Sequence, residues 1–271
     1  MAIDVSDSFV RQYESEVHLT FQRKGSKLRG TVRNQSNVEG SSTTFQVVGK
    51  GTAVSKGRHS EIPPMNLSHT PVECTLSDHY AGDFADKLDL NKLNIDERQA
   101  IARSGANALG RKIDDLITTQ MDAVSTLGTS AFTLDVARQM IEALSDNDVP
   151  MDEGSVYGAV GYRQWNIMLK DSAFSSSDFV GDHPLKNFVT PKLWSGVIWF
   201  PCSGDCLPLS GSNRSVFLYH MDAVGCASGE EIMADITWQG TRAAWWINHM
   251  MSMGAVVIDS NGIVKYAATE S

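Results

Sequence analysis

A helical spacing of apolar residues over about 30 positions constrains this chain more than any other feature of its sequence. Apolar residues recur every three or four positions from Ile95 to Val124, and Asn94 with Glu97 forms a capping-box pattern at the start. A helix of this length extends about 42 Å. The sequence therefore predicts one long helix over 94–124, in which Gly105 and Gly110 indicate a bend or close packing.

The rest of the chain after this helix alternates between helical and strand patterns. A second amphipathic helix is expected over 133–145, with Thr133 as its cap, and a short helix over 162–171. Strands are expected over 156–160, 196–202 and much of 231–269, whereas 215–227 fits either a third helix or an extended core segment. Asn261-Gly262 between alternating apolar runs predicts a β-hairpin. The fold class is therefore α+β.

The leading quarter of the chain has too few apolar residues for a core of its own. Alternation at Val17, Leu19 and Phe21 predicts a strand with an unpaired edge. Residues 34–75 read as a long glycine-containing hairpin, which is marginal alone and is either mobile or supported by a neighbour. Residues 1–60 carry a net charge of +4 in a chain of −9. This asymmetry suits contact between one end and the acidic body of another copy, and it argues against a free nucleic-acid binder.

Motifs that support catalysis or metal binding are not apparent. We find no HExxH, GxSxG, Walker loop or GxGxxG pattern. Cys202 and Cys206 have no second pair at zinc-site spacing, because Cys74 and Cys226 are distant, so free buried thiols are expected. We predict no catalytic, cofactor-binding or metal-binding residue and favour a structural or assembly role.

Two other residue pairs are interpreted structurally. Asp114-Asp115 on the long helix is expected to be a solvated face rather than an acid/base pair. Trp245-Trp246 is expected to pack two layers from opposite faces of a strand. No apolar run approaches the roughly 18–20 residues of a membrane helix, and the mixed-charge start excludes a signal peptide.

The order of these elements resembles that of the major capsid protein of tailed bacteriophages, the Hong Kong-97-type fold. Three stretches of the sequence are similar to members of that family: the early segment Phe21–Gly30, Val149-Pro150 followed by the pattern from Tyr162 to Gly181, and the ending Gly254–Lys265. Each motif alone has low specificity, and their order carries the resemblance over essentially the whole chain.

The resemblance implies a division of the chain into five regions. They are an N-terminal arm (1–33), an extended E-loop (34–75), a P-domain with the spine helix (76–127), an α/β A-domain (128–247) and C-terminal strands that return to the P-domain (248–271). The arm and the loop also supply the expected intersubunit contacts: Arg23, Lys24, Lys27, Arg29, Lys50, Lys56 and Arg58.

The resemblance also implies function and partners. Copies would self-assemble into hexamers and pentamers of an icosahedral head shell that encloses double-stranded DNA without sequence-specific binding, with no enzymatic activity, cofactor or membrane partner. Only about 33 residues precede the hairpin, so a separate scaffolding protein is expected, together with a portal and a decoration protein. The protein would be part of the virion and assemble in the host cytoplasm. We expect no isopeptide crosslinks, since no signature marks an Asn or Glu partner for Lys50 or Lys56.

Two alternatives remain open at this point. One is a cellular nanocompartment shell of the encapsulin type, which shares the fold and would carry a protein cargo. The other is a small cytosolic hydrolase with a dispersed active site. Size-exclusion chromatography separates the hydrolase from both shell proteins, because a shell subunit gives megadalton particles or capsomers.

Overall fold

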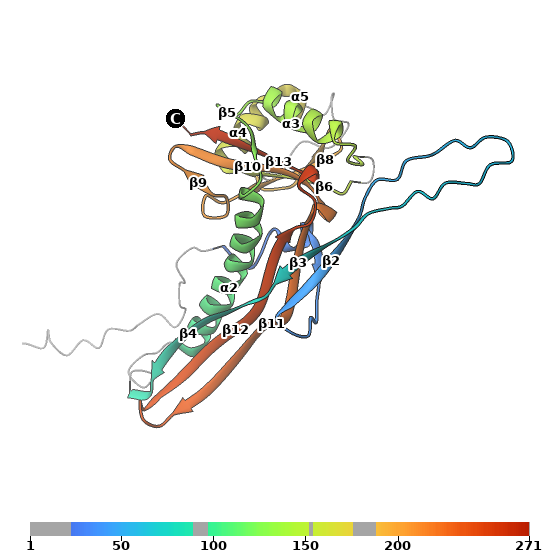
Figure 1. The fold of residues 1–271 in the computed structure, drawn as a ribbon. Coiled ribbons are helices and arrows are strands. Elements are labelled where there is room, and N and C mark those ends of the chain that lie inside the picture. The colour runs from blue at the N-terminus through green and yellow to red at the C-terminus, as the bar shows by residue number, and fades with distance from the viewer. Residues whose placement is uncertain (1–22, 89–96, 152–153, 176–187, 271) are drawn as a thin grey trace, which may run out of the picture.

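The computed structural model describes residues 23–88, 97–151, 154–175 and 188–270. In Figure 1 an α/β unit lies at the top, a long sheet with one long helix extends below it, and a hairpin projects to the side. The expected α+β class is confirmed.

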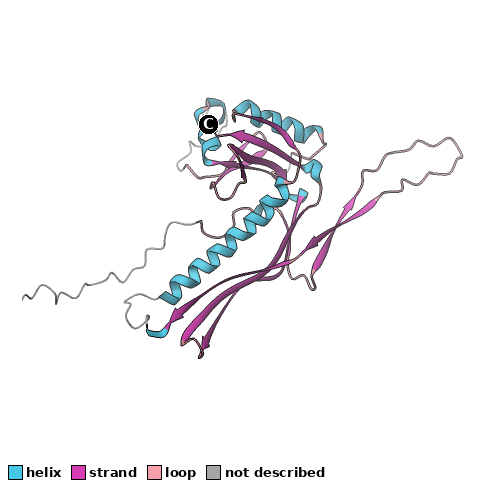
Figure 2. Ribbon diagram, turned by 60° about the vertical axis from the view of Figure 1, so that its left-hand side comes forward, coloured by secondary structure: helices cyan, strands magenta, loops and turns pink. Residues whose placement is uncertain are grey.

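The lower unit combines the long helix with a four-stranded sheet in the order β1-β11-β12-β4. Strand β1 runs parallel to β11, and the other neighbours are antiparallel. The elements are α2 (Glu97–Asp122), β1 (Arg33–Gln35), β4 (Ser77–Asp86), β11 (Val224–Gln239) and β12 (Ala244–Val257). Figure 2 shows α2 along one side of this sheet, and no helix of the described residues covers the other side.

Helix α2 confirms the long helix expected from the periodicity. Its C-terminal half buries the row Leu109, Ile113, Ile117 and Met121 in the core. Its glycines allow close packing: a Cβ on Gly110 would lie 2.6 Å from the backbone of the N-terminal segment, far inside van der Waals contact. The expected cap residue Asn94 lies outside the described residues.

The upper unit is built on a seven-stranded sheet in the order β5-β13-β10-β6-β8-β7, with β9 paired to β10. Its strands are β5 (Thr126–Ser130), β6 (Val156–Gly161), β7 (Lys192–Trp194), β8 (Val197–Cys202), β9 (Leu209–Ser210), β10 (Asn213–His220) and β13 (Ile263–Thr269). Its helices are α3 (Leu134–Asp146), α4 (Tyr162–Lys170) and α5 (Ser172–Ser175). The expected cap of α3 is confirmed, because Thr133 Oγ1 accepts from Val136 N at 3.3 Å.

Two hydrophobic cores share this sheet. Phe217 and Tyr219 of β10 pack into the core beside α2, and the alternate residues Val216 and Leu218 pack into the core beside α3. A strand covered on both faces reads as a continuous apolar run. This explains why the segment 215–227 fitted either a helix or an extended core segment. The structure resolves it as the end of β10, a 3₁₀ turn (Met221–Ala223) and the start of β11.

The hairpin consists of β2 (Ser42–Val48) and β3 (His69–Thr75), paired antiparallel along their whole length. Its base is held by Phe45, which is buried with Cys74 against Ala227 of β11. Residues 49–68 continue beyond the paired strands, and their loop projects away from both units (Figure 1). Its base still reaches the upper unit, where Lys50 pairs with Asp148.

The hairpin expected at Asn261-Gly262 is wrong. The turn Ser260–Gly262 is a 3₁₀ turn, and the strands on its two sides enter different sheets. Neither residue has a positive φ, although the two-residue hairpin turn favoured by Asn-Gly requires it. Pairing of β12 with β11 and of β13 with β10 therefore prevails over the local turn signal.

This topology also corrects the expected boundary at 247/248, because it falls inside β12. Strand β11, expected in the A-domain, pairs with β12 beside α2, whereas β13 joins the seven-stranded sheet instead of returning to the lower one.

The expectation that the leading quarter lacks support within its own subunit is wrong for residues 23–48, whereas residues 49–68 project away from it. Leu28 and Val32 are buried in the core of their own chain, and β1 pairs with β11. The strand expected at Val17–Phe21 lies outside the described residues.

Candidate assembly surfaces

The segment 23–32 is fastened to α2 by one buried carboxylate. Asp114 is fully buried and accepts hydrogen bonds from the backbone N–H groups of Lys27 at 3.1 Å and Leu28 at 3.0 Å, and from the Ser26 hydroxyl. Arg23 Nη2 lies 3.3 Å from Asp114 Oδ2. The expectation of a solvated Asp114 is therefore wrong. It neutralises a buried guanidinium and satisfies backbone donors that would otherwise be buried without partners.

Three of the four basic residues expected at intersubunit contacts on the arm have partners within the chain. Arg23 binds Asp114, Lys27 Nζ donates to the Pro201 carbonyl at 3.3 Å, and Arg29 binds Glu231 through two hydrogen bonds. Lys24 is exposed and is the arm residue that best remains a predicted intersubunit contact.

The ion pair between Arg29 and Glu231 predicts a dependence of stability on pH. The hydrogen bond from Arg29 lowers the pKa of Glu231. The contribution of this ion pair to the free energy of unfolding is therefore present above the carboxyl pKa of the unfolded chain, about 4.3. It is lost as pH falls through the lower pKa that Glu231 has in the folded chain. Because the Glu231 side chain is 48% exposed, we expect at most about 1 kcal/mol. Urea unfolding of the parent chain and of Glu231→Gln should be measured from pH 6 to pH 3. The difference between their free energies of unfolding should shrink as the pH falls, and a growing difference would contradict the prediction.

The hairpin tip, residues 49–68, is the first candidate assembly surface. Val54, Ile62, Met65 and Leu67 are 57%, 77%, 52% and 38% exposed. The tip carries three basic residues and one acidic residue, Glu61. The basic residues are those expected at intersubunit contacts: Lys50, Lys56 and Arg58. All three are exposed.

The contacts of these basic residues within the chain are peripheral. Lys50 pairs with Asp148 at 2.6 Å, but both side chains are more than three-quarters exposed. Lys56 Nζ donates to the Ser60 carbonyl within the tip at 3.3 Å. The tip therefore offers a basic and apolar surface for a partner, and the intersubunit role of its three cations remains a prediction.

The second candidate surface is the side of the long sheet that faces away from α2. Met250 is paired with Tyr80 on one side and with Met233 on the other, which puts the three side chains on one face. Tyr80 is 67% exposed and Met233 46%, whereas the next residue, His249, is buried on the helix side. Asp78 and Asp235 occupy the same face, two residues along the register. We call this surface the open face: Asp78, Tyr80, Met233, Asp235 and Met250.

The outer edge of β11 offers a further contact site. Among the described residues, β1 pairs only with Gly225–Ala227 of β11, so the edge from Glu230 to Gln239 has no partner strand there. Ile236 and Trp238 on this stretch are 51% and 42% exposed. They pair with Ile247 and Trp245, so they lie on the helix side of the sheet, opposite the open face. Unpaired strand edges and exposed apolar patches mark protein contact sites.

The remaining candidates have structural roles. All four cysteines are free and buried, as expected. Trp245 packs against Trp238, and its neighbour Trp246 packs against Phe84, with ring centroids 5.3 Å and 4.4 Å apart. Within the described ranges, no group of three His, Cys, Asp or Glu is placed to hold a metal ion, and no helix is long and apolar enough to cross a membrane.

The residues that sequence reasoning missed are Asp114 and those of the open face. One feature of the sequence pointed to the role of Asp114, namely the glycine at position 25. In the structure Gly25 has a φ of +64°, and the turn directs successive backbone N–H groups toward one point, which forms an anion-binding concavity. The open face could not be recognised from the sequence, because the pattern of residues along a strand does not show which face of the sheet the helix leaves uncovered.

The comparisons with known proteins agree with this architecture. The sequence matches the phage capsid protein family over residues 5–270. A comparison with curated proteins gives no match. Among solved structures, the capsid of cyanophage P-SCSP1u has a TM-score of 0.76 at 15% identity, covering 100% of this chain and 96% of that one. The Mycobacterium phage Che8 structure has a TM-score of 0.76 at 16% identity, covering 96% and 97%. The capsid of a native GTA particle has a TM-score of 0.72 at 13% identity, covering 98% and 99%. From the family match over nearly its whole length, this chain belongs to the phage capsid protein family, and it is a major capsid protein of the phage head shell.

Proposed function

We propose that this major capsid protein assembles by laying its hairpin tip on the open face of the next copy. The observation that carries the proposal is the tip itself, because it exposes four large apolar side chains far from its own core. Apolar side chains that find no cover in their own subunit gain free energy when a neighbour covers them.

Charge complementarity supports the choice of the open face. The tip carries Lys50, Lys56 and Arg58, and the open face carries Asp78 and Asp235 around its apolar centre. Because the two surfaces differ, the contact is heterologous and propagates from copy to copy until a ring closes. We propose that such rings are the hexamers and pentamers of an icosahedral shell.

The proposed division of labour follows the architecture. Helix α2 and the sheet β1-β11-β12-β4 form the P-domain, the upper α/β unit forms the A-domain, and the hairpin is the E-loop. The protein acts by assembly and catalyses no reaction. It assembles in the host cytoplasm with a separate scaffolding protein, a portal through which DNA enters, and a decoration protein. The net charge of −9 supports enclosure of double-stranded DNA without specific binding.

Charge reversal on the tip tests the proposal. Lys50→Glu, Lys56→Glu and Arg58→Glu together are expected to abolish shells, because three weak attractions become repulsions from the acidic open face at every contact. A single surface pair contributes only about 0–1 kcal/mol, so the triple variant is needed. Electron microscopy and sedimentation of the purified protein measure the outcome. The matched control Lys50→Arg, Lys56→Arg and Arg58→Lys keeps the charge and should assemble. Normal shells from the charge-reversed chain would refute this mode of contact.

A further inference from the structure

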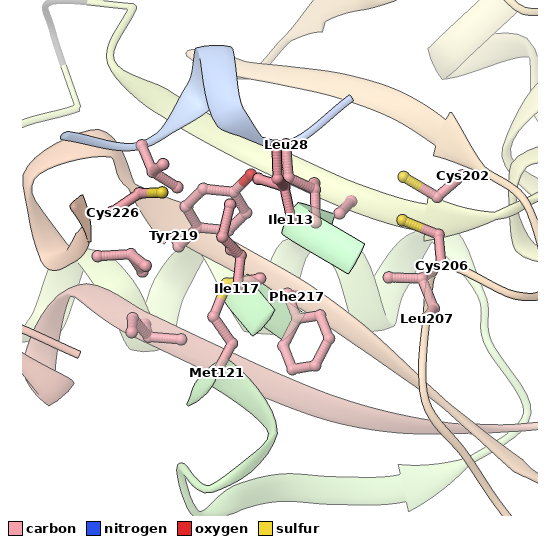
Figure 3. Close-up of a cluster of buried hydrophobic side chains, with 14 of the residues drawn as sticks. Leu28, Ile113, Ile117, Met121, Cys202, Cys206, Leu207, Phe217, Tyr219 and Cys226 are labelled. Atoms are coloured by element: carbon pink, nitrogen blue, oxygen red, sulfur yellow. The ribbon is translucent and has the colours of Figure 1, made fainter. Parts of the chain in front are cut away.

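Two thiols lie side by side beneath the N-terminal segment. Cys202 ends β8, and Cys206 follows a tight turn that is closed by a hydrogen bond from Cys206 N to the Ser203 carbonyl at 2.9 Å. Figure 3 shows both sulfur atoms pointing into the same space in the core. Both cysteines are free. This arrangement differs from that of isolated buried thiols, because each sulfur has the other as a neighbour.

A buried guanidinium stands next to this pair. The Arg23 side chain is only 9% exposed, and its Nη2 lies 3.3 Å from Asp114 Oδ2. The Cys206 Sγ lies 3.9 Å from the same Asp114 oxygen. The Nε and Nη1 groups of Arg23 are buried and find no hydrogen-bond partner among the described residues. Two nitrogens of a cation, which together carry three N–H groups, are thus held near Cys206.

The two thiols are unequal in acidity. A hydrogen bond from Cys202 lowers the pKa of Cys206, and Arg23 acts in the same direction, while burial and the Asp114 carboxylate oppose it. The Cys202 pKa is raised by its hydrogen bond with Cys206 and by burial. Cys206 therefore deprotonates first, and a thiolate is the nucleophilic form of cysteine.

Solvent access favours the same order of reaction. A cavity of about 410 Å³ is lined by Cys206 together with Leu207 and Pro208 on one side and Thr118 and Asp122 of α2 on the other. Cys202 does not line it. A small oxidant that enters this cavity therefore reaches Cys206 rather than Cys202.

We propose that Cys202 and Cys206 form an oxidation site at which a small hydroperoxide produces an intramolecular disulfide. The Cys206 thiolate attacks one peroxide oxygen, the O–O bond breaks, and the released hydroxide takes a proton to become water. The resulting sulfenic acid is attacked by the Cys202 sulfur, which loses its proton as the S–S bond forms and a second water leaves. Two thiols and one hydrogen peroxide thus give one disulfide and two waters. This site is independent of the proposed mode of assembly.

Hydrogen peroxide on the reduced, full-length protein tests the proposal by peptide mass analysis. Trypsin leaves both thiols in one peptide, 193–214, and leaves Cys74 and Cys226 in two others, 59–87 and 215–242. After alkylation of the remaining thiols, peptide 193–214 should lose two hydrogen atoms and carry no alkyl group, and a thiol reductant should restore both sites. The other two peptides should remain alkylated. An unoxidised peptide 193–214, or equal oxidation of Cys74 or Cys226, would overturn the proposal.

Single substitutions separate the roles of Cys202, Cys206 and Arg23. In Cys202→Ser a sulfenic-acid trap such as dimedone should label Cys206, and in Cys206→Ser it should leave Cys202 unlabelled. Arg23→Gln should slow disulfide formation about tenfold if it removes about one pKa unit of thiolate stabilisation. The matched control Lys24→Gln changes the adjacent, exposed cation and should leave the rate unchanged. Equal rates for Arg23→Gln and Lys24→Gln would refute the role of Arg23 in stabilising the Cys206 thiolate. Labelling of Cys202 in Cys206→Ser, without labelling of Cys206 in Cys202→Ser, would refute the order of reaction.

Discussion

Replacing Asp114 by alanine is expected to release the N-terminal segment from α2 and to lower the free energy of unfolding by about 3–5 kcal/mol. The substitution leaves the Arg23 guanidinium buried without its counterion. It also removes the acceptor of the Lys27 and Leu28 backbone N–H groups, and buried donors without partners are costly. Denaturant unfolding measures the loss. Hydrogen exchange should locate it at residues 23–32, where amide protection falls.

The neighbouring aspartate provides a matched control. Asp115 pairs with Lys112 on the exposed side of the helix, so Asp115→Ala should change the free energy of unfolding by no more than about 0.5 kcal/mol. Gly110→Ala tests the same contact sterically, because its Cβ would lie 2.6 Å from the Cα of Gly25. It should also raise exchange at residues 23–32, although alanine favours the helix by about 1 kcal/mol. Equal effects of Asp114→Ala and Asp115→Ala would contradict the anchoring role.

The outcome for Asp114 shows where sequence reasoning ends. The long helix, the cap at Thr133 and most strands of the upper unit were predictable, because they depend on periodicity and on side chains a few positions apart. A carboxylate on a helix has the same local pattern whether it faces solvent or a backbone segment 86 positions away. Its burial depends on where the N-terminal segment passes, and no periodicity encodes that.

The errors at the C-terminal end have a similar cause. Asn261-Gly262 favours a hairpin locally, but β13 gains more by pairing with β10, where Val264, Tyr266 and Ala268 join a buried core. Tertiary pairing overrides a two-residue preference. The expected boundary at 247, which the resemblance implied, falls inside β12. The open face was beyond sequence reasoning for a different reason: its identity depends on which side of the sheet α2 covers.

The largest expected effect on assembly comes from the apolar residues of the hairpin tip. Replacement of Val54, Ile62, Met65 and Leu67 by serine should abolish closed shells and leave the unfolding free energy of the subunit almost unchanged. All four side chains are substantially exposed in the single chain, so the folded subunit loses little. Each contributes roughly 1–2 kcal/mol when a neighbour covers it, and the loss recurs at every contact of the shell. Electron microscopy and sedimentation measure assembly, and thermal unfolding checks the fold. A control with Val54→Ile, Ile62→Val, Met65→Leu and Leu67→Met keeps the apolar surface and should assemble.

A mixing experiment identifies the surface that receives the tip. A second variant, Tyr80→Asp with Met233→Asp, keeps its tip and adds charge to the apolar centre of the open face, where both side chains are exposed. Alone, it should also fail to form shells. In a mixture, the tip variant offers an intact open face and the face variant an intact tip, so one contact forms in each pair and no second contact can follow. A heterologous contact of this kind cannot close a ring from such halves, and analytical ultracentrifugation should show mixed pairs without shells. Shells from the face variant alone would place the docking surface elsewhere on the molecule.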